Sequence, residues 1–525
     1  MSIELPEQFN VADHLILPNL TPERADKVFM YCLDETLTFR QLHERSNQAG
    51  NALRRLGVTL ENRVLLLMLE SLSFPTTFFG AMRLGAVPVP VNTLLGPKDY
   101  LYYITDSRAR IVVVDEALWP QIEPIEKDLK YKPEIVIANG SVPGKRSLDD
   151  LVAAESTELE TEMLSPDDAA FWLYTSGSTG SPKAAVHLHH DIVFSNEHFG
   201  GPFLQLKPGD LTFSAAKFFF AYGLGNSLYI PLAVGASSVV NPGRPTPEAV
   251  FEVLQKFRPK VFYGVPTLFN GMVNTYEAWQ RGEGDPPTEI PTLDHLEFSV
   301  SAGESLPEAL YKRWQTHFGS EILDGIGSTE MLHIYICNKR GKIRPGSTGQ
   351  VVEGYEAKLV DEKGQPVGDN QIGALLVRGD SAAAYYWNKH EKTKATMQGE
   401  WLVTGDQFHR DSDGYYWYEG RNDDMMKVSG SWVSPMEIEN ALLGHPAVME
   451  CAVVGKMDEV GLNKPKAFVV LKSGQSPSDE MAESMIEHVK VSIASFKAPA
   501  WVEFASDLPK TATGKIRRFQ LRDPA

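Results

Sequence analysis

Short apolar runs alternate along the first half of the chain with longer segments in which apolar residues recur every three or four positions. The runs at 64–68, 111–114 and 135–137 are rich in valine, leucine and isoleucine and contain no polar residue. Such runs are typical of strands that are buried on both faces of a parallel sheet. Segment 38–56 instead places its leucines near one helical face, and Gly57 is expected to end that helix.

The same alternation continues with strand-like runs at 237–240, 261–265 and 298–301, each next to a segment with helical periodicity. Strands that alternate with helices in this way predict sheets that are joined by right-handed crossovers. We therefore expect an α/β fold for most of the chain.

The pattern changes after about residue 350. Segments 356–360, 374–377 and 415–418 are separated by glycine and aspartate turns, which indicates a smaller β-rich subdomain. The last hundred residues combine strands with one helix near 479–493, and the polar run 420–424 is our candidate domain boundary.

At 525 residues the chain is too long for one ordinary hydrophobic core. The sequence predicts a large N-terminal domain of residues 1–420 with α/β sheets, in which about 350–420 form the smaller β subdomain. A small α+β C-terminal domain is expected at 421–525.

Composition narrows the class of protein. Hydrophobic residues make up 43% and charged residues 22% of the chain, as in ordinary globular proteins. The formal net charge of −18 argues against nucleic acid as a partner. The three cysteines are widely spaced, the N-terminus lacks a signal-peptide pattern, and the most apolar region, 64–91, is broken by charges. We expect a cytoplasmic protein without a membrane partner.

The run 174–183 is rich in serine, threonine and glycine, follows the apolar segment 169–173 and ends in Lys183. A strand that leads into bare backbone N–H groups, hydroxyls and an ammonium is suited to phosphate oxygens. It differs from the G-x-x-x-x-G-K-[ST] loop, because Pro182 precedes the lysine and no hydroxyl residue follows it. The alternative is a flexible linker.

Further polar segments occur where core packing would not require them. Residues 301–305 follow a predicted strand and lead into a helix, and 324–330 follow another and offer a carboxylate for Mg²⁺. Segment 401–406 ends in an aspartate that could bind a ribose diol, Arg421 lies in the candidate boundary, and 509–518 places lysines on a Gly/Thr turn. Taken singly, each is more often a turn or a solvated charge.

In their order these segments resemble the motifs of the acyl-adenylate-forming superfamily, which includes acyl- and aryl-CoA ligases, firefly luciferase and the adenylation domains of peptide synthetases. The motifs read YTSGSTGSPK, SAGESLP, GSTE, WLVTGD, YYWYEGRNDDMMKVSGSWVSPMEIE and PKTATGK. They extend over nearly the whole chain. The resemblance implies a mobile C-terminal domain and two half-reactions: a carboxylate reacts with Mg·ATP to give an acyl-AMP and pyrophosphate, and coenzyme A then takes the acyl group.

The resemblance also implies residue roles. Lys515 is the catalytic cation that bridges carboxylate and ATP, which repel each other, and one such preorganised charge is worth ~3–4 kcal/mol. Thr329 and Glu330 hold the α-phosphate and Mg²⁺. The other nucleotide contacts are Thr175, Ser176, Thr179 and Lys183 at the triphosphate, Asp406 and Arg421 at the ribose, and Gly303, Glu304, Ser305, Asp324 and Gly325 toward the adenine. Asp423 matches the hinge, and Ser429 and Gly430 match the turn that faces the thioester half-site.

The acid is expected to bind at segment 217–227, where aromatic residues with small neighbours suit a flat ring better than an alkyl chain. Two departures occur. Phe220 replaces a histidine of hydroxycinnamate and chlorobenzoate ligases, and Ile326 replaces an aromatic residue that stacks on adenine. The arrangement looks most like the benzoate–CoA ligases. The predicted pocket residues are Phe220, Ala221, Tyr222, Ser227, Ala302, Gly327, His333, Ile334 and Lys427.

Two pocket residues leave alternatives open. His333 either hydrogen-bonds a ring substituent, which favours 4-hydroxybenzoate or another substituted benzoate, or it only forms the pocket wall. Lys427 either approaches the substrate carboxylate or faces solvent. The histidines and aspartate of segment 187–191 could suggest a metal, but no second ligand group stands at suitable spacing.

The leading hypothesis is therefore an AMP-forming aryl-acid–CoA ligase for benzoate, with ATP, Mg²⁺ and coenzyme A and a role in aromatic degradation. From other classes, a phosphotransferase would release ADP, and an inactive nucleotide-binding homologue would form no thioester. The presence of Glu330, Asp406, Arg421 and Lys515 together speaks against an inactive homologue. A homodimer is left open.

Overall fold

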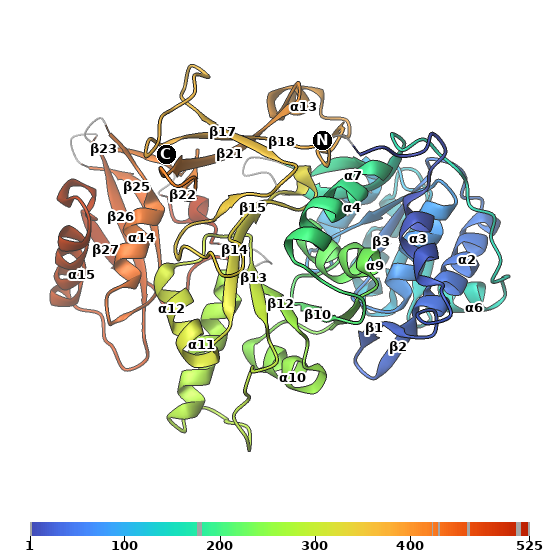
Figure 1. The fold of residues 1–525 in the computed structure, drawn as a ribbon, viewed down its shortest axis with the longest axis horizontal. Coiled ribbons are helices and arrows are strands. Elements are labelled where there is room, and N and C mark those ends of the chain that lie inside the picture. Colours follow the sequence, from blue (N-terminus) through green and yellow to red (C-terminus); the bar gives the residue numbers. More distant parts are fainter. Residues whose placement is uncertain are drawn as a thin grey trace.

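The computed structural model describes residues 3–175, 181–422, 424–428, 431–458, 462–510 and 516–522. Figure 1 shows the N-terminal sheet in blue, a large central sheet mainly in green and yellow, and a C-terminal part in orange and red. A smaller sheet extends across the top of the central one in that view.

The N-terminal five-stranded sheet has the order β4-β3-β5-β6-β7, and all of its pairs are parallel. Its strands are β3 (Arg63–Leu67), β4 (Val87–Pro90), β5 (Ile111–Asp115), β6 (Glu134–Ala138) and β7 (Arg146–Ser147). The helices of this region include α2 (Phe39–Arg55), α3 (Ser73–Arg83) and α4 (Pro97–Ser107). Thr38 and Gln41 form a capping box that fixes the start of α2.

The central nine-stranded sheet has the order β16-β15-β14-β13-β12-β10-β11-β1-β2. The strands from β14 to β1 pair in parallel, and antiparallel strands flank them at both edges. The strands are β1 (Val28–Cys32), β2 (Glu35–Thr38), β10 (Leu211–Ser214), β11 (Ser237–Val240), β12 (Val261–Gly264), β13 (Phe298–Ser301), β14 (Glu321–Gly327), β15 (Ile334–Cys337) and β16 (Gln350–Val351). Helices α8 (Ala221–Leu224), α10 (Pro247–Phe257), α11 (Pro266–Gln280) and α12 (Glu308–Phe318) belong to the same region.

Two smaller antiparallel sheets complete the N-terminal region. One has the order β19-β9-β8 and consists of β8 (Ala169–Thr175), β9 (Lys183–Leu188) and β19 (Tyr385–Tyr386), with α7 (His189–Ser195) directly after β9. The other consists of β17 (Glu356–Val360), β18 (Gly373–Arg378), β20 (Met397–Gln398), β21 (Trp401–Arg410) and β22 (Tyr416–Arg421). The second one is the β-rich subdomain that the sequence predicts.

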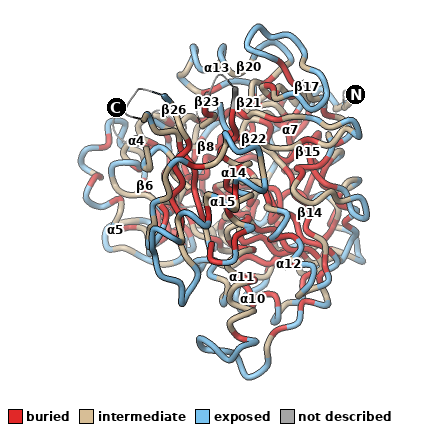
Figure 2. The backbone as a smooth tube through the Cα atoms, turned by 90° about the vertical axis from the view of Figure 1, so that its left-hand side faces the viewer, coloured by how far each residue is buried: buried red, intermediate tan, exposed pale blue. Residues whose placement is uncertain are grey.

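The C-terminal part has a hydrophobic core of its own, which includes Ile438, Leu442, Val453, Met485 and Val489. The elements around it are α14 (Pro435–Leu443), β25 (Val448–Met457), β26 (Asn463–Leu471), α15 (Asp479–Ser492) and β27 (Trp501–Phe504), with the hairpin β23 (Met426–Val428) and β24 (Ser431–Val433) before them. Figure 2 shows buried residues concentrated on the strands and exposed residues along the outer loops.

The architecture confirms the α/β fold class with a large N-terminal and a small α+β C-terminal part. Every strand-like run named from the sequence overlaps a strand, and the helix expected at 38–56 is α2. No helix among the described residues is long and apolar enough to cross a membrane.

Two segments differ from their interpretation in the sequence, in which 324–330 follow a strand and a turn is the alternative for 401–406. Residues 324–327 continue strand β14, and 404–406 lie inside β21. The glycines of β14 reflect close strand packing, because a Cβ at Gly325 would lie 3.0 Å from the Ile336 carbonyl and one at Gly327 would lie 2.5 Å from the His333 carbonyl. Glycine therefore indicates an approaching neighbour strand here instead of a turn.

Candidate active site

The predicted phosphate loop lies between β8 and β9. Thr175 ends β8 and pairs with Lys183, the first residue of β9. The Lys183 ammonium lies 4.4 Å from the centre of the Tyr386 ring, and burial lowers its pKa while Glu330 acts in the opposite direction. Ser176 and Thr179 lie outside the described residues. The lysine is thus directed from the loop toward the carboxylate of a distant motif.

Tyr386 connects Lys183 to Glu330. Its hydroxyl donates a hydrogen bond to Glu330 Oε1 over 2.5 Å, and burial together with the Glu330 charge raises the pKa of the phenol. The tyrosine reaches this position because β19 pairs with β9, with Tyr386 opposite Ala185. No motif signal identified Tyr386, since its place depends on strand pairing far along the chain.

Thr329 and Glu330 lie in a short 3-10 turn, 329–331, whose start is capped by the Ser328 hydroxyl. The three successive carbonyl oxygens of this turn accept hydrogen bonds from different elements. The donors are His187 Nε2 at 2.8 Å, the Ala383 N–H at 2.7 Å and the Ser381 hydroxyl at 2.9 Å. The turn is therefore fixed through its backbone, which leaves both side chains available to a ligand.

His187 is fully buried, and both of its ring nitrogens face acceptors. Nδ1 lies 2.7 Å from Asp191 Oδ2, and Nε2 lies 2.8 Å from the Thr329 carbonyl oxygen. The ring therefore connects the Thr329 turn to the first turn of helix α7, which contains Asp191. His187 and Asp191 thus serve the Thr329 turn, a role that sequence reasoning missed.

His189 differs from His187 although it lies two residues away and is equally buried. Its Nδ1 accepts a hydrogen bond of 3.1 Å from the Val11 N–H, and burial lowers its pKa to about 4. His189 therefore fastens helix α1 (Val11–Ile16) and has no contact with the Thr329 turn. The rings of His187 and His189 are engaged in hydrogen bonds, and no group of three metal-ligating side chains occurs in the part of the chain that is described.

Asp406 and Arg421 form the predicted ribose pair. They are register partners of β21 and β22, and Arg421 Nη1 lies 3.0 Å from Oδ1 of the buried Asp406. The Asp406 charge raises the pKa of Arg421 further above its usual range. Gly405 in β21 has a φ of 79°, and a Cβ there would lie 3.0 Å from Arg421 Nη2, so the glycine makes room for the guanidinium.

The predicted adenine side lies between β13 and α12. Gly303 is exposed and Glu304 and Ser305 are partly exposed, as expected for a ligand contact. Asp324 is instead buried, and its Oδ2 accepts the Leu306 N–H at 3.2 Å. Burial raises the pKa of Asp324 to about 8. Asp324 thus orders the residues after Ser305, whereas Gly325 lies against β15.

The predicted acid pocket lies between α8 and the segment after the Thr329 turn. Tyr222 donates a hydrogen bond of 2.9 Å to the Val300 carbonyl, and its ring centre lies 5.9 Å from that of His333. A Cβ at Gly225 would lie 2.4 Å from the His333 ring, so only glycine fits beside it. Ala221, Ser227, Ala302 and Ile334 are buried, and Phe220 and Gly327 are partly exposed.

His333 is the polar group of this pocket. It is 2% exposed, and burial lowers its pKa to about 3, so the ring is neutral at physiological pH. Neither ring nitrogen has a hydrogen-bond partner among the described residues. A neutral imidazole has one donor and one acceptor to offer. A buried ring in this condition suits a ligand with a polar substituent.

Several predicted residues cannot be placed. Lys515, Asp423, Ser429 and Gly430 lie outside the described residues. Lys427 lies on β23, opposite Trp432.

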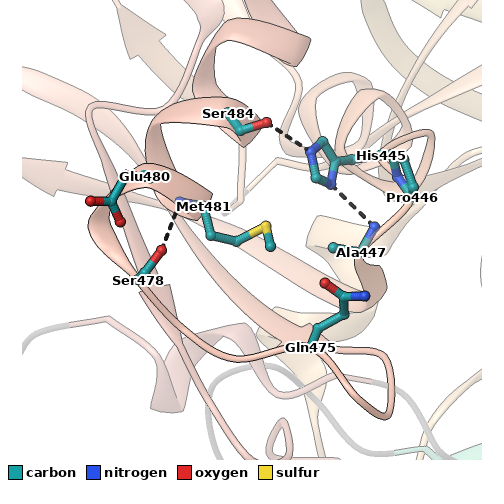
Figure 3. Close-up of a pocket in the computed structure, with 8 residues that line it drawn as sticks. All are labelled: His445, Pro446, Ala447, Gln475, Ser478, Glu480, Met481 and Ser484. Atoms are coloured by element: carbon teal, nitrogen blue, oxygen red, sulfur yellow. Dashed lines mark hydrogen bonds between the residues drawn. The ribbon is translucent and has the colours of Figure 1, made fainter.

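A separate cavity of about 420 Å³ lies in the C-terminal part (Figure 3). It is bordered by the start of α15 and the segment after α14, where His445 Nε2 lies 3.2 Å from the Ser484 hydroxyl. None of the predicted site residues lines this cavity.

Comparisons with known proteins find two matching family models and a similar ligase. A family model described as AMP-binding enzyme matches residues 21–387, and one described as AMP-binding enzyme C-terminal domain matches 437–515. The benzoate–CoA ligase of Thauera aromatica is 47% identical over 523 residues, which cover 99% of this chain and 97% of that protein.

Two solved structures are similar over the whole chain. The anthranilate CoA ligase AuaEII, in complex with anthranoyl-AMP, has a TM-score of 0.93 and 43% identity, covering 98% of this chain and 97% of that one. A benzoate CoA ligase from Burkholderia xenovorans LB400 has a TM-score of 0.89 and 42% identity, covering 98% and 100%.

Proposed function

This chain belongs to the AMP-binding enzyme family, and we infer that it is an AMP-forming acid–CoA ligase whose substrate is benzoate. The observation that carries the proposal is the meeting of Lys183, Glu330 and Arg421, which come from three distant motifs. The Lys183 ammonium lies 4.4 Å from the centre of the Tyr386 ring, the Tyr386 hydroxyl donates to Glu330 over 2.5 Å, and the Glu330 charge contributes to the raised pKa of Arg421.

The proposed reaction has two steps. In the first, a benzoate oxygen attacks the α-phosphorus of ATP, the bond to the β-phosphate oxygen breaks, and pyrophosphate leaves. Lys183 and Thr175 stand at the loop that receives the leaving pyrophosphate, and Thr329 stands at the α-phosphate. In the second step the thiolate of coenzyme A attacks the acyl carbonyl carbon and AMP leaves with the electron pair of the broken C–O bond.

Lys515 is proposed to bridge the two anions during the first step. Arg421 and the Asp406 carboxylate would orient the ribose, so that the α-phosphorus lies in line with the attacking oxygen. Tyr222, Gly225 and His333 would hold the aromatic ring. The domain boundary at about residue 421, the hinge at Asp423 and the thioester turn at Ser429 and Gly430 are proposed on the same basis, and the boundary falls between the two matched family regions.

The magnesium ion that the family implies fits Glu330. A carboxylate oxygen is the ligand type that Mg²⁺ takes beside substrate phosphates. Tyr386 donates to one oxygen of Glu330, and a carboxylate retains further acceptor sites after one hydrogen bond. When bound, Mg²⁺ would neutralise phosphate charge, and Tyr386 would keep the carboxylate oriented toward it.

A substituted benzoate is the second candidate substrate. The unpartnered nitrogens of the buried His333 favour a ring with a hydroxyl or amino group, and the similar structure AuaEII is described with anthranoyl-AMP. Cytoplasmic action follows from the need for ATP and coenzyme A. A homodimer and a role in aromatic degradation stay predictions.

One panel of acids tests the proposal. Benzoate, the hydroxybenzoates, 2-aminobenzoate, cinnamate and hexanoate are each assayed for release of AMP and pyrophosphate with and without coenzyme A. We expect benzoate to give the highest kcat/KM, with thioester formation that requires ATP. Release of ADP would indicate a phosphotransferase, absence of AMP and thioester would indicate an inactive homologue, and a preference for hexanoate would contradict the aryl pocket.

A further inference from the structure

We propose that Glu70 is a positioning residue for the acid pocket, which it serves by fastening the segment 217–220 to the neighbouring five-stranded sheet. This inference rests on the proposed function, because segment 217–220 leads directly into the helix that holds the aromatic ring. Glu70 lies far from the motifs and touches neither the nucleotide residues nor the predicted acid contacts.

Glu70 follows β3 at the carboxyl end of its sheet and is only 5% exposed. Its two carboxylate oxygens hold two successive residues of the segment. Oε1 accepts the Phe218 N–H at 2.9 Å, and Oε2 lies 3.0 Å from the Lys217 ammonium. One carboxylate thus fixes both the backbone and a side chain of the same turn.

The Lys217 ammonium extends the connection to a third segment. It donates to the carbonyl oxygens of Asn241 at 2.5 Å and Gly243 at 2.8 Å, both just after β11. An ammonium has three N–H donors, so Glu70 and these two carbonyls satisfy it completely. The loops after β3, β10 and β11 are therefore tied together by a single side chain.

Phe218 adds an apolar contact on the same side. Its ring stacks on Phe74 of α3, with ring centres 4.4 Å apart and planes 9° from parallel. Backbone and side chain of Phe218 are thus both held by elements of the N-terminal sheet region.

The anchored turn determines where α8 begins. The Phe220 N–H donates to the Lys217 carbonyl at 3.0 Å, and α8 starts at the next residue. A Cβ at Gly223 would lie 2.1 Å from that same carbonyl oxygen, so helix and turn are in direct contact. Tyr222 lies on this helix and Gly225 directly follows it, and a displaced turn would therefore displace the surfaces that contact the ring.

Glu70 and Lys217 form a buried ion pair, and the two charges can be removed singly or together. Burial raises the pKa of Glu70, and the Lys217 ammonium acts against that shift. Removing one partner of a buried pair leaves an uncompensated charge, which usually destabilises a fold, whereas removing both charges can be neutral. Stability and substrate positioning can therefore be separated by experiment.

The test compares Glu70→Gln with the double variant Glu70→Gln/Lys217→Met in the full-length enzyme. Glutamine keeps an acceptor for the Phe218 N–H but loses the charge that orders Lys217. We expect KM for benzoate to rise about tenfold in both variants, as loss of one charged hydrogen bond predicts. KM for MgATP should stay within about twofold, and the double variant should recover the thermal stability that the single one loses.

Asp13→Asn is the matched control. Asp13 pairs with the buried Arg83 at 3.0 Å and so links α1 to α3 without touching segment 217–220. This variant should lower the melting temperature and leave both KM values unchanged. A folded Glu70→Gln enzyme with unchanged KM for benzoate, or with equal rises in both KM values, would overturn the positioning role. A wild-type enzyme that is inactive with every aryl acid would instead refute the proposed function.

Discussion

The acid side and the nucleotide side of the proposed site are each fixed by a buried polar side chain from another element, but in opposite ways. On the acid side, Glu70 accepts a hydrogen bond from the backbone of segment 217–220 and binds its ammonium. On the nucleotide side, His187 donates to the backbone carbonyl of Thr329 and is itself held by Asp191. The two anchors share no residue.

This difference suggests that the two substrates are positioned independently. The acid pocket is lined by apolar and aromatic side chains, so its shape depends on where a backbone segment lies. On the nucleotide side, the side chains of Thr329 and Glu330 must be available to the nucleotide and Mg²⁺. The turn is accordingly held through its carbonyl oxygens. Damage to either anchor should therefore appear in the kinetics of one substrate only.

Lys515→Ala should give the largest effect. It should affect both substrates together, because this lysine is proposed to bridge the benzoate carboxylate and ATP. Loss of one preorganised charge should lower the rate of adenylation by about 10²–10³-fold. Pyrophosphate exchange measures that step, and thioester formation from supplied benzoyl-AMP should stay nearly intact. Lys510→Ala is the control, since Lys510 pairs with Glu450 at 2.8 Å. Equal loss of both half-reactions would contradict the assigned role.

His187→Gln should give the next largest effect, confined to the nucleotide side. Glutamine cannot donate to Thr329 while it is held by Asp191 in the same geometry, and a buried carbonyl left without its hydrogen bond should raise KM for MgATP about tenfold. KM for benzoate should remain unchanged. His189→Gln provides the comparison, because it removes an equally buried ring that contacts only the α1 side. A similar rise in KM for both variants would mean that burial alone is responsible.

His333→Phe sharpens the acid side. The ring keeps its apolar contacts but loses both nitrogens, so kcat/KM for hydroxy- or aminobenzoates should fall about fivefold relative to benzoate, as for one neutral hydrogen bond. Competition between paired substrates measures this ratio directly. An unchanged ratio would assign His333 to the pocket wall.

The smallest effect is expected for the coupling between the two anchors, which is the deviation of the double variant from the product of the two single effects. Glu70→Gln and His187→Gln share no partner, and changes at independent sites add within about 0.5 kcal/mol, roughly twofold in kcat/KM. The double variant should therefore show the product of the two single effects. A larger deviation would show that the two sides move as one unit.

The sequence was sufficient for features that depend on local pattern. Buried strands such as β3 and β5 appear as uninterrupted apolar runs, and α2 has a helical stripe with a capping residue. Asp406 and Arg421 were named from separate motifs, and the pairing of β21 with β22 brings them together. Motif residues can be recognised because their residue types and positions within a short segment identify them, without knowledge of their contacts in the folded structure.

The anchors could not be predicted, because they depend on contacts between distant segments. Glu70 interrupts an apolar region without any motif around it, and its meaning depends on where segment 217–220 comes to lie. Tyr386 reaches Glu330 only through the pairing of β19 with β9. The glycines of β14 suggested a turn, because the sequence does not show the approach of β15.

The ammonium of Lys217, which ties the loops after β3, β10 and β11, also has a consequence for enzyme engineering. Residues 217–227 would be a natural cassette to transplant when another ligase is to be given an aryl specificity. The transplanted segment alone would lack the Glu70 carboxylate and the carbonyl groups of Asn241 and Gly243 that hold Lys217 in place. A recipient therefore needs Glu70, Phe74 and the loop after β11 together with segment 217–227. The residues that determine aryl specificity thus come from several separate segments of the chain.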